Sequence, residues 1–347
     1  MHEPLAKPGV LAALGAALLF GAGTPLAKSL LSNISPWLLA GLLYLGAGFG
    51  LTIYRKLAHA PKVLLPRSER FWFVGAILSG GVIGPVLLML GLSGMPASGA
   101  SLLLNAEGMF TALLAWFVFK ENFDFRIAFG MVAIAAGALV LSWSGEMDFS
   151  GLWPTFAVLG ACLSWGIDNN LTRKVSLTDA TWIASIKGLA SGTVNLALAF
   201  GLGAAIPQWP AIAGAMFVGF VSYGVSVALF VTGLRNLGTA RTGAYFSIAP
   251  FFGALLALVM GEVLTWQLLA AGLLMALGTW LHFTEHHAHE HTHADFEHEH
   301  EHIHDEHHNH EHDFPIEADT KHRHPHRHSP QKHIHAHFPD AHHRHSH

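Results

Sequence analysis

Long apolar runs, separated by short polar connections, occupy the chain from residue 9 to residue 282. We count ten of these runs, each about 20 residues long, which is the length that a helix needs to cross the hydrocarbon core of a bilayer. This pattern predicts an all-α polytopic membrane protein with ten transmembrane helices. The expected spans are residues 9–28, 36–54, 71–92, 98–119, 124–144, 152–172, 181–203, 211–232, 242–261 and 264–282.

Lys and Arg residues gather in alternate connections between these runs. Short cytoplasmic loops collect basic residues, so the alternation predicts that both termini face the cytoplasm of a bacterial-type inner (plasma) membrane. Glu146 and Asp148 would then lie outside. The first run lacks a convincing cleavage site, and we expect it to be kept as a helix. The basic residues are Arg55, Lys56, Lys62, Arg67, Arg70, Lys120, Arg126, Arg173, Lys174, Arg235 and Arg241.

The apolar region contains an internal repeat. Residues 110–115, FTALLA, recur as residues 252–257, FGALLA, and each copy runs into an acid, Glu121 or Glu262. Further matches pair Leu14, Gly15, Ala16, Leu18, Gly21 and Leu26 with Leu159, Gly160, Ala161, Leu163, Gly166 and Leu171, and Phe73, Val74, Gly75 and Gly80 with Phe217, Val218, Gly219 and Gly224.

The repeat divides the membrane region into two domains, residues 1–144 and 145–282. Each copy contains five spans, and because five is odd the two copies have opposite orientations in the membrane. Inverted repeats of this kind are typical of secondary transporters, whose substrate sites lie near the bilayer midplane at the repeat interface.

The ten spans, the five-plus-five repeat, the small-residue helix ending at Lys28 and the segment NAEGMFTALLAWFVFKE resemble the drug/metabolite transporter superfamily, EamA type. The resemblance covers residues 9–282. It implies two inverted five-helix repeats and transport of a small solute by alternating access.

This chain departs from the family pattern at two places. The fourth and ninth spans of the family usually carry an acid–proline pair, whereas here Glu107 precedes glycine and Pro250 follows alanine. The first span has Phe20 where the family favours tryptophan, and its repeat mate Trp165 keeps the tryptophan.

Four ionisable residues lie within the spans: Lys28, Glu107, Asp168 and Lys187. A charge at the bilayer centre costs about 2.5 to 3.5 kcal/mol on insertion scales, so it normally faces a partner or a water-filled cavity. Asp168 and Lys187 are expected at similar depth on helices joined by a short loop. They form either a salt bridge that fixes helix packing or part of a substrate cavity together with Trp165, Asn169 and Asn170.

Glu107, with Asn105 nearby, is the stronger candidate for a transport role. We expect it to line the cavity as a substrate contact or as a group that takes up a proton. Lys28 lies near the outer end of the first span, from which its side chain can extend to the interface.

Other features limit the functional classes. Pro25, Pro85 and Pro250 interrupt spans, which membrane helices tolerate where neighbouring groups or cavity water satisfy the freed backbone.

The sequence has no phosphate-binding glycine loop and no metalloprotease motif, so an enzyme is not expected. Cys162 is the single cysteine, which excludes an intrachain disulfide. No nucleic acid partner and no required cofactor are expected.

The composition changes abruptly after Leu281, and all histidines except His2 and His59 follow this point. The tail, residues 283–347, has little apolar surface, so we expect it to be cytoplasmic and disordered in the absence of metal. Imidazole binds Zn, Ni, Co and Cu, and alternate histidines of an extended chain can converge on one ion. The alternative is a solvated polar tail. The candidate ligands are His298, His300, His302, His304, His307, His308, His310 and His312.

The sequence therefore predicts a secondary transporter that exports a metabolite, with a metal-binding tail that regulates it. Two alternatives remain open at this stage: a transition-metal exporter, and a membrane-anchored metal buffer or sensor. The spans contain one cysteine and no intramembrane histidine, which favours an organic solute. Protons as the coupling ion and a homodimeric assembly are further expectations.

Overall fold

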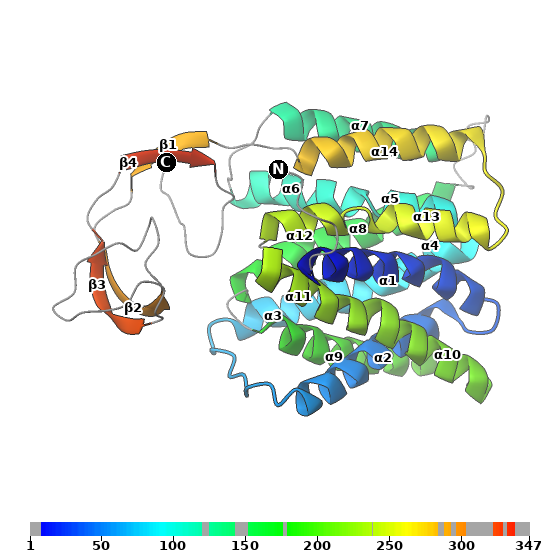
Figure 1. Ribbon diagram of the computed structural model, residues 1–347. Coiled ribbons are helices and arrows are strands. Elements are labelled where there is room, and N and C mark those ends of the chain that lie inside the picture. The colour runs from blue at the N-terminus through cyan, green and yellow to red at the C-terminus, as the bar shows by residue number, and fades with distance from the viewer. Residues whose placement is uncertain are drawn as a thin grey trace. The chain divides into compact units, whose positions relative to one another are not determined.

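A computed structural model of the protein describes residues 8–119, 125–142, 152–175, 179–237, 239–283, 288–292, 296–302, 322–328 and 332–336. Residues 1–285 and residues 286–347 form two separate units, and the first is a bundle of helices (Figure 1). Lys120, Glu121, Glu146 and Asp148, which the topology and repeat predictions use, lie outside the described residues.

Each of the ten predicted spans coincides with helical structure. Among the residues that the structure describes, seven helical stretches are long and apolar enough to cross a membrane, and residues 128–142 and 266–281 form shorter apolar helices. The first half of the membrane region contains α1 (Pro8–Leu30), α2 (Pro36–Leu57), α3 (Arg70–Ala76), η1 (Ile77–Ile83), α4 (Gly84–Gly94), α5 (Ala97–Leu103), α6 (Ala106–Phe119) and α7 (Phe125–Ser142).

The second half of the membrane region follows the same order of long and interrupted helices. It contains α8 (Trp153–Thr172), the short 3₁₀ turn η3 (Arg173–Val175), α9 (Ala180–Gly201), α10 (Trp209–Gly219), η4 (Phe220–Val225), α11 (Ser226–Leu237), α12 (Thr239–Phe246), α13 (Ala249–Val259) and α14 (Trp266–Phe283). Large apolar side chains cover the outside of the bundle. Phe71, Phe125 and Val259 are each more than three-quarters exposed, as expected of surfaces that face lipid.

Two helices are broken at positions that correspond in the repeat. A π-helical segment, η1, joins α3 to α4 and contains Gly80, and a second one, η4, joins α10 to α11 and contains Gly224. The turn at Leu104 and Asn105 between α5 and α6 likewise corresponds to the turn between α12 and α13. π-helical segments are rare and frequently occur at functional sites. η1 and η4, at the same level of the bundle, are therefore candidate positions for the functional site.

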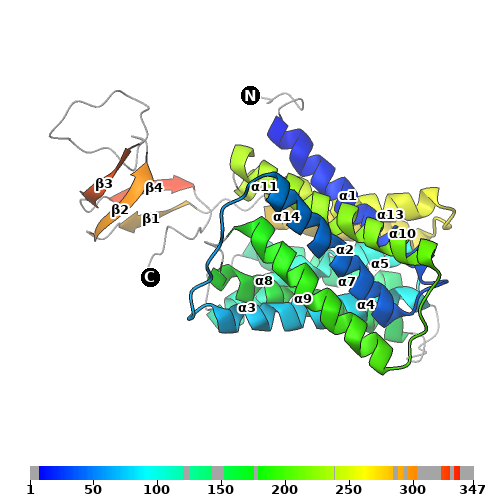
Figure 2. The same cartoon turned by 90° about the horizontal axis from the view of Figure 1, so that it is seen from below.

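Glycines allow α2 and α9 to cross at close range, and the two helices run side by side in Figure 2. A Cβ atom at Gly48 would lie 2.5 Å from the backbone nitrogen of Leu189, and one at Gly188 would lie 2.8 Å from Gly48. Small residues of this kind let membrane helices approach closely. Gly48 and Gly188 therefore let α2 and α9 pack closely, and α7 and α14 form a second adjacent pair at one edge of the bundle (Figure 1).

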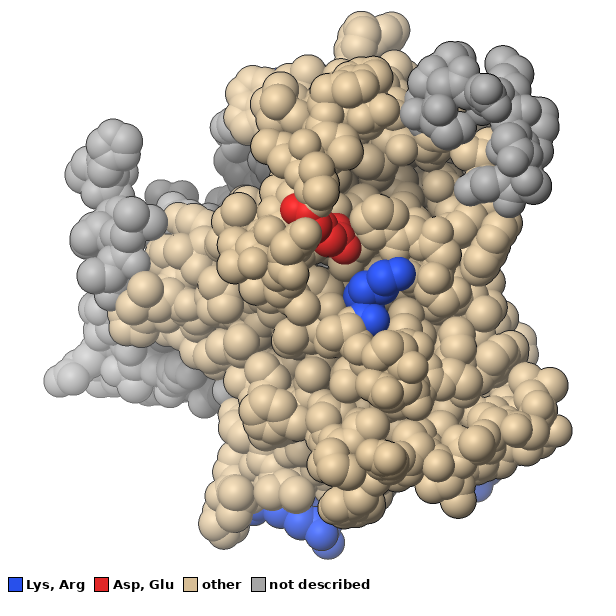
Figure 3. Space-filling model, turned by 90° about the vertical axis from the view of Figure 1, so that its right-hand side faces the viewer, with Lys and Arg blue, Asp and Glu red and all other residues tan. Residues whose placement is uncertain are grey.

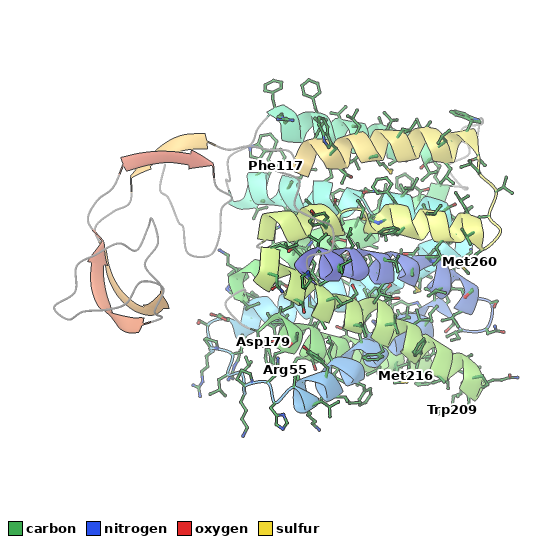
Figure 4. All side chains as sticks on the ribbon, in the orientation of Figure 1. Arg55, Phe117, Asp179, Trp209, Met216 and Met260 are labelled. Carbon is green, nitrogen blue, oxygen red and sulfur yellow. The ribbon has the colours of Figure 1, made fainter. Side chains whose placement is uncertain are left out.

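The ends of the bundle are chemically different. Figure 4 shows Arg55 and Asp179 at one end, called here the Arg55 end, and Trp209 and Met260 at the opposite end, called the Met260 end. At the Arg55 end, the guanidinium of Arg55 contacts the carboxylate of Asp179 at 2.6 Å. Asp179 also accepts a hydrogen bond from the backbone N–H of Trp182 and thereby caps α9.

The tail contains regular structure where none was expected. Strand β1 (Ala288–Thr292) pairs with β4 (Lys332–Ala336), and β2 (Phe296–His302) pairs with β3 (His322–His328), both antiparallel. The physical reason lies in the sequence pattern, because the His-x-His alternation has the two-residue period of a strand. The expectation of disorder is thus corrected for these four segments.

Candidate functional site

The site is built around the π-helical segment η1, where the regular helical hydrogen bonds are interrupted. The backbone carbonyl of Gly80 accepts hydrogen bonds from the hydroxyl of Tyr44 at 3.0 Å and from the indole N–H of Trp165 at 2.8 Å. The neighbouring carbonyl of Gly81 accepts from the amide of Asn195 at 3.1 Å. Side chains from α2, α8 and α9 therefore satisfy backbone groups that η1 leaves unpaired, as buried carbonyls require.

Asp168 and Lys187 meet beside this segment. The Lys187 ammonium donates to both carboxylate oxygens of Asp168, at 2.6 and 2.7 Å, and the hydroxyl of Thr172 donates to one of them at 2.9 Å. The side chains are 16% and 8% exposed for Lys187 and Asp168. A Cβ atom at Gly80 would collide with the Asp168 carboxylate, so glycine is needed there for the pair to approach η1. The predicted pairing is present.

Glu107 lies on the first turn of α6 and contacts α8. Its Oε1 atom accepts a hydrogen bond from the amide of Asn169 at 2.9 Å, and that amide also reaches the hydroxyl of Thr111 at 3.2 Å. Among the side chains that the structure describes, no Lys or Arg contacts Glu107. Glu107 is nevertheless within electrostatic range of Asp168 and Lys187.

The two remaining predicted site residues are engaged in packing contacts. The amide of Asn105 donates to the carbonyl of Leu102 at 2.8 Å, and its oxygen accepts from Thr279 of α14 at 3.1 Å. The amide of Asn170 donates to the carbonyls of Gly166 and Thr111, which ties α8 to α6. The structure thus brings together Glu107, Trp165, Asp168, Asn169 and Lys187, while the contacts of Asn105 and Asn170 hold helices.

A row of aromatic rings extends from Tyr44 and was not found from the sequence. The ring of Tyr44 lies 6.1 Å from that of Tyr223, whose ring meets Phe20 edge-on at 5.6 Å. Phe20 in turn lies 5.2 Å from Phe246, and Phe246 lies 4.9 Å from Phe230. Tyr44 also lies within electrostatic range of Asp168 and Glu107. The available signal was a tyrosine hydroxyl inside an apolar run, which needs a polar partner when buried.

Helices α1, α5 and α13 close tightly at the Met260 end. Gly21 of α1 abuts the backbone carbonyl of Ala249, and a Cβ atom at Gly253 would lie 2.7 Å from both the Ser101 hydroxyl and the Gly21 carbonyl. We call the contact of Gly21, Ser101 and Gly253 the glycine seam.

Two charged side chains form hydrogen bonds with backbone groups at helix ends next to the glycine seam. Glu262 accepts hydrogen bonds from the N–H groups of Ala97 and Ser98, at 2.7 and 2.9 Å, and Lys28 donates to the carbonyl of Leu92 at 2.5 Å. Figure 3 looks at the Met260 end and shows one acidic and one basic patch near the centre of a mostly uncharged face, with further basic atoms along its lower edge.

At the Arg55 end, the described residues make only part of the matching contact. In the repeat alignment, α12 corresponds to α5 and α6 corresponds to α13. Gly166 of α8 contacts Phe110 and Thr111 of α6, as Gly21 of α1 contacts α13. Helix α12, however, packs against α1, α11 and α14, and its described residues make no comparable packing with α6 or α8. The two ends of the site are therefore unequally closed.

An apolar cavity of about 300 Å³ lies apart from these polar groups. Met109, Phe110, Leu139, Phe156 and Leu159 contribute to its walls from α6, α7 and α8, and none of the predicted site residues lines it. Leu139 and Phe156 are also more than half exposed on the outer surface of the bundle.

Within the described residues no group of three or more His, Cys, Asp or Glu is placed to hold a metal ion.

Comparison with known proteins gives consistent results. The pattern of the EamA-like transporter family matches the chain twice, at residues 7–143 and 152–284. An uncharacterized transporter of Methanothermobacter thermautotrophicus is 29% identical over 273 residues, 73% of this chain and 79% of the relative.

A probable amino-acid metabolite efflux pump of Salmonella typhimurium is 27% identical over 293 residues, 80% of this chain and 94% of the relative. A solved crystal structure with 20% identity superimposes with a TM-score of 0.58 over 79% of this chain and 96% of the other. That likeness shows the fold alone.

Proposed function

Because the chain belongs to the EamA-like transporter family and is a multi-pass membrane transporter rather than an enzyme, we propose that it exports a small metabolite by secondary active transport. Relatives of Salmonella typhimurium and Escherichia coli are named as probable amino-acid metabolite efflux pumps, which supports an organic solute and an outward direction. The relative of Escherichia coli is 28% identical over 288 residues.

The proposed topology is ten transmembrane helices in two inverted five-helix repeats, within residues 1–144 and 145–282, in a bacterial-type inner membrane. The broken helices at η1 and η4 and the double family match support the repeat. The alternating Lys and Arg residues support cytoplasmic termini, which would make the Arg55 end cytoplasmic and the Met260 end external.

The unequal closure of the two ends of the site is the observation that supports transport by alternating access. The glycine seam joins α1, α5 and α13 at the Met260 end, whereas the corresponding packing of α12 against α6 is absent among the described residues. In an inverted repeat, exchange of these two arrangements would open the opposite end. The structure in this proposal is an inward-facing state.

Glu107 is proposed to couple transport to protons. It lies near the middle of the fourth predicted span, accepts one amide hydrogen bond and has no described cationic partner. A carboxylate at this depth can take up a proton on one side of the membrane and release it on the other. The Asp168–Lys187 pair is proposed to maintain the shape of η1 in both states.

The tail is proposed to bind divalent Zn, Ni, Co or Cu ions and to regulate export. The register of its strands places His298 opposite His326, His300 opposite His324 and His302 opposite His322. The predicted ligands His304, His307, His308, His310 and His312 lie outside the described residues. We also propose that the protein is a homodimer.

Uptake into proteoliposomes tests the function. The full-length protein, a variant truncated after residue 283, and the variants Glu107→Gln and Glu69→Gln would be compared with amino acids and their amides and esters as solutes. Glu69 precedes α3 and makes no side-chain capping bond, so its variant is the matched control. We expect proton-dependent transport by the wild type and Glu69→Gln and none by Glu107→Gln. Absence of transport of every organic solute by the wild type would contradict the proposal.

A further inference from the structure

We propose that the central site selects amphipathic amines, meaning solutes in which a cationic nitrogen is joined to an aromatic or apolar body. This inference rests on the proposed function, because it takes the region around η1 as the transport site. It adds the chemical class of the solute, which neither the family nor the names of the relatives supply.

The charges of the site leave one carboxylate available. Lys187 donates to both oxygens of Asp168, so these two charges neutralise each other and each satisfies the other. Glu107 has only the neutral amide of Asn169 as a described polar partner of its side chain. An ionised Glu107 therefore gives the site a net charge of −1, and a cation is the ligand that compensates this charge at membrane depth.

The aromatic row begins at Tyr44, which also contacts η1. Tyr44 links the two regions, since its hydroxyl donates to Gly80, its ring lies 6.1 Å from Tyr223, and Glu107 is within its electrostatic range. Phe20, Tyr44 and Tyr223 are each only partly buried although they belong to the interior of the bundle. Aromatic faces attract organic cations and provide apolar contact for the remainder of such a ligand.

A comparison of the two copies of the repeat shows that the site has a polar side and an aromatic side. Phe20 and Trp165 occupy matching positions, yet Trp165 belongs to the polar side with Asn169 one turn away on α8, and Phe20 belongs to the aromatic side with Tyr223. Tyr223 of η4 matches Ser79 of η1, whose hydroxyl donates to the backbone of Ser164. One repeat thus supplies rings where the other supplies polar groups, and a ligand with one polar and one apolar end fits this asymmetry.

The pairing of Lys187 with Asp168 also argues against a free carboxylate on the solute. Lys187 acts electrostatically on Glu107, and its ammonium already has two short contacts to Asp168. An anionic group on the ligand would have to break this pair or face Glu107 directly. Amines and amino-acid amides or esters should consequently bind more tightly than zwitterionic amino acids of the same size.

Calorimetric binding to the purified full-length protein in lipid nanodiscs tests the inference. Phenethylamine would be compared at pH 7.5 with 2-phenylethanol and phenylacetate, which keep the ring and replace the ammonium by a neutral or anionic group. The amine is protonated at this pH, as a lysine amine is. We expect its Kd to be at least tenfold lower than those of the other two probes, a ratio equivalent to about 1.4 kcal/mol.

Variants separate the contributions of charge and ring. Glu107→Gln should weaken phenethylamine at least tenfold and leave 2-phenylethanol unchanged, Phe20→Leu should weaken both, and Glu69→Gln should change neither. Equal binding of the three probes, tighter binding of phenylacetate, or no binding of phenethylamine to the wild type would overturn the inference. Because the probe ratio is measured on the wild type, it remains decisive if a variant does not fold.

The outcome is distinguishable from failure of the proposed function. If the amines do not bind while a zwitterionic or anionic solute is transported in proteoliposomes, the solute class is wrong and the export function stands. If no organic solute is transported and none binds, both proposals fail.

Discussion

Lys187 donates to both carboxylate oxygens of Asp168 at 2.6 and 2.7 Å, which joins α9 to α8 beside the π-helical segment η1. Breaking a buried pair by removing one partner leaves an uncompensated charge and typically costs about 3 to 5 kcal/mol. The pair therefore has consequences for stability that are separable from any contact with solute.

We expect Asp168→Asn and Lys187→Gln each to lower the thermal unfolding temperature of the detergent-solubilised protein and to reduce transport. The double variant should lose less stability than the two single variants added together, because it removes both charges of one interaction. Thermal unfolding of the four proteins measures this coupling. Strictly additive losses would show that the two groups act independently.

Glu107→Gln removes the carboxylate with little change of volume, so the protein should still insert and fold. We expect it to abolish solute transport driven by a proton gradient while solute exchange at equal concentrations persists at a reduced rate. Fluorimetric proton flux and radiolabelled solute exchange in the same proteoliposomes provide the measurement. Wild-type transport with an unchanged pH profile would show that Glu107 has a packing role only.

Gly253→Val should open the glycine seam, because a Cβ atom there already meets Ser101 and the Gly21 carbonyl at 2.7 Å. Ser101→Cys, in a Cys162→Ala background, reports access from outside by reaction with a membrane-impermeant maleimide. We expect labelling to rise about tenfold as the population shifts to the outward-facing state. Gly201→Val is the matched control, since a Cβ atom at Gly201 meets nothing within 4 Å. Equal labelling with and without Gly253→Val would contradict the assignment.

Asp179 should contribute a pH-dependent stability at the Arg55 end. Burial by itself raises the pKa of Asp179, but hydrogen bonds from Thr181 and Trp182 and the charge of Arg55 outweigh it and lower the pKa below the usual value. The folded pKa is therefore below the unfolded one. The stabilisation is fully present above the unfolded pKa of about 3.9 and is lost as pH falls through the folded pKa.

Two substitutions distinguish the charge from the cap at this position. Asp179→Asn keeps a good N-cap and should cost at most about 1 kcal/mol at pH 7, since the Asp179 side chain is 22% exposed. Asp179→Ala also loses the cap and should cost about 1 kcal/mol more. Unfolding at pH 7 and pH 3 measures both effects. An Asp179→Asn deficit that is equally large at pH 3 would contradict the electrostatic origin.

The tail should bind several transition-metal ions per chain in the full-length protein. Binding requires neutral imidazole, whose unperturbed pKa is about 6.5, so we expect strong binding of Zn, Ni and Co at pH 7.5 and its loss by about pH 5.5. Calorimetry of the full-length protein and of the variant truncated after residue 283 tests this. If neither protein binds these ions more tightly than millimolar at pH 7.5, the tail is a solvated appendage.

The sequence by itself determined the features that depend on local composition. Apolar runs of bilayer length identify the helical segments, and the cost of a charge in hydrocarbon singles out Glu107, Asp168 and Lys187 wherever they sit in the fold. The repeat could also be found, because matching residues keep their spacing along the chain. Even the pairing of Asp168 with Lys187 follows from their equal depth on neighbouring helices.

Only the tertiary structure decided which helix faces meet. Tyr44, Tyr223 and Phe20 lie far apart in sequence, and apolar periodicity does not distinguish a face that lines a site from one that contacts lipid. The polar groups Asn105 and Asn170 gave no sign that they bond to neighbouring helices. The closure of one end also depends on tertiary packing, and the two copies differ there, because the repeat places Thr111 at the position that corresponds to Gly253 of the glycine seam.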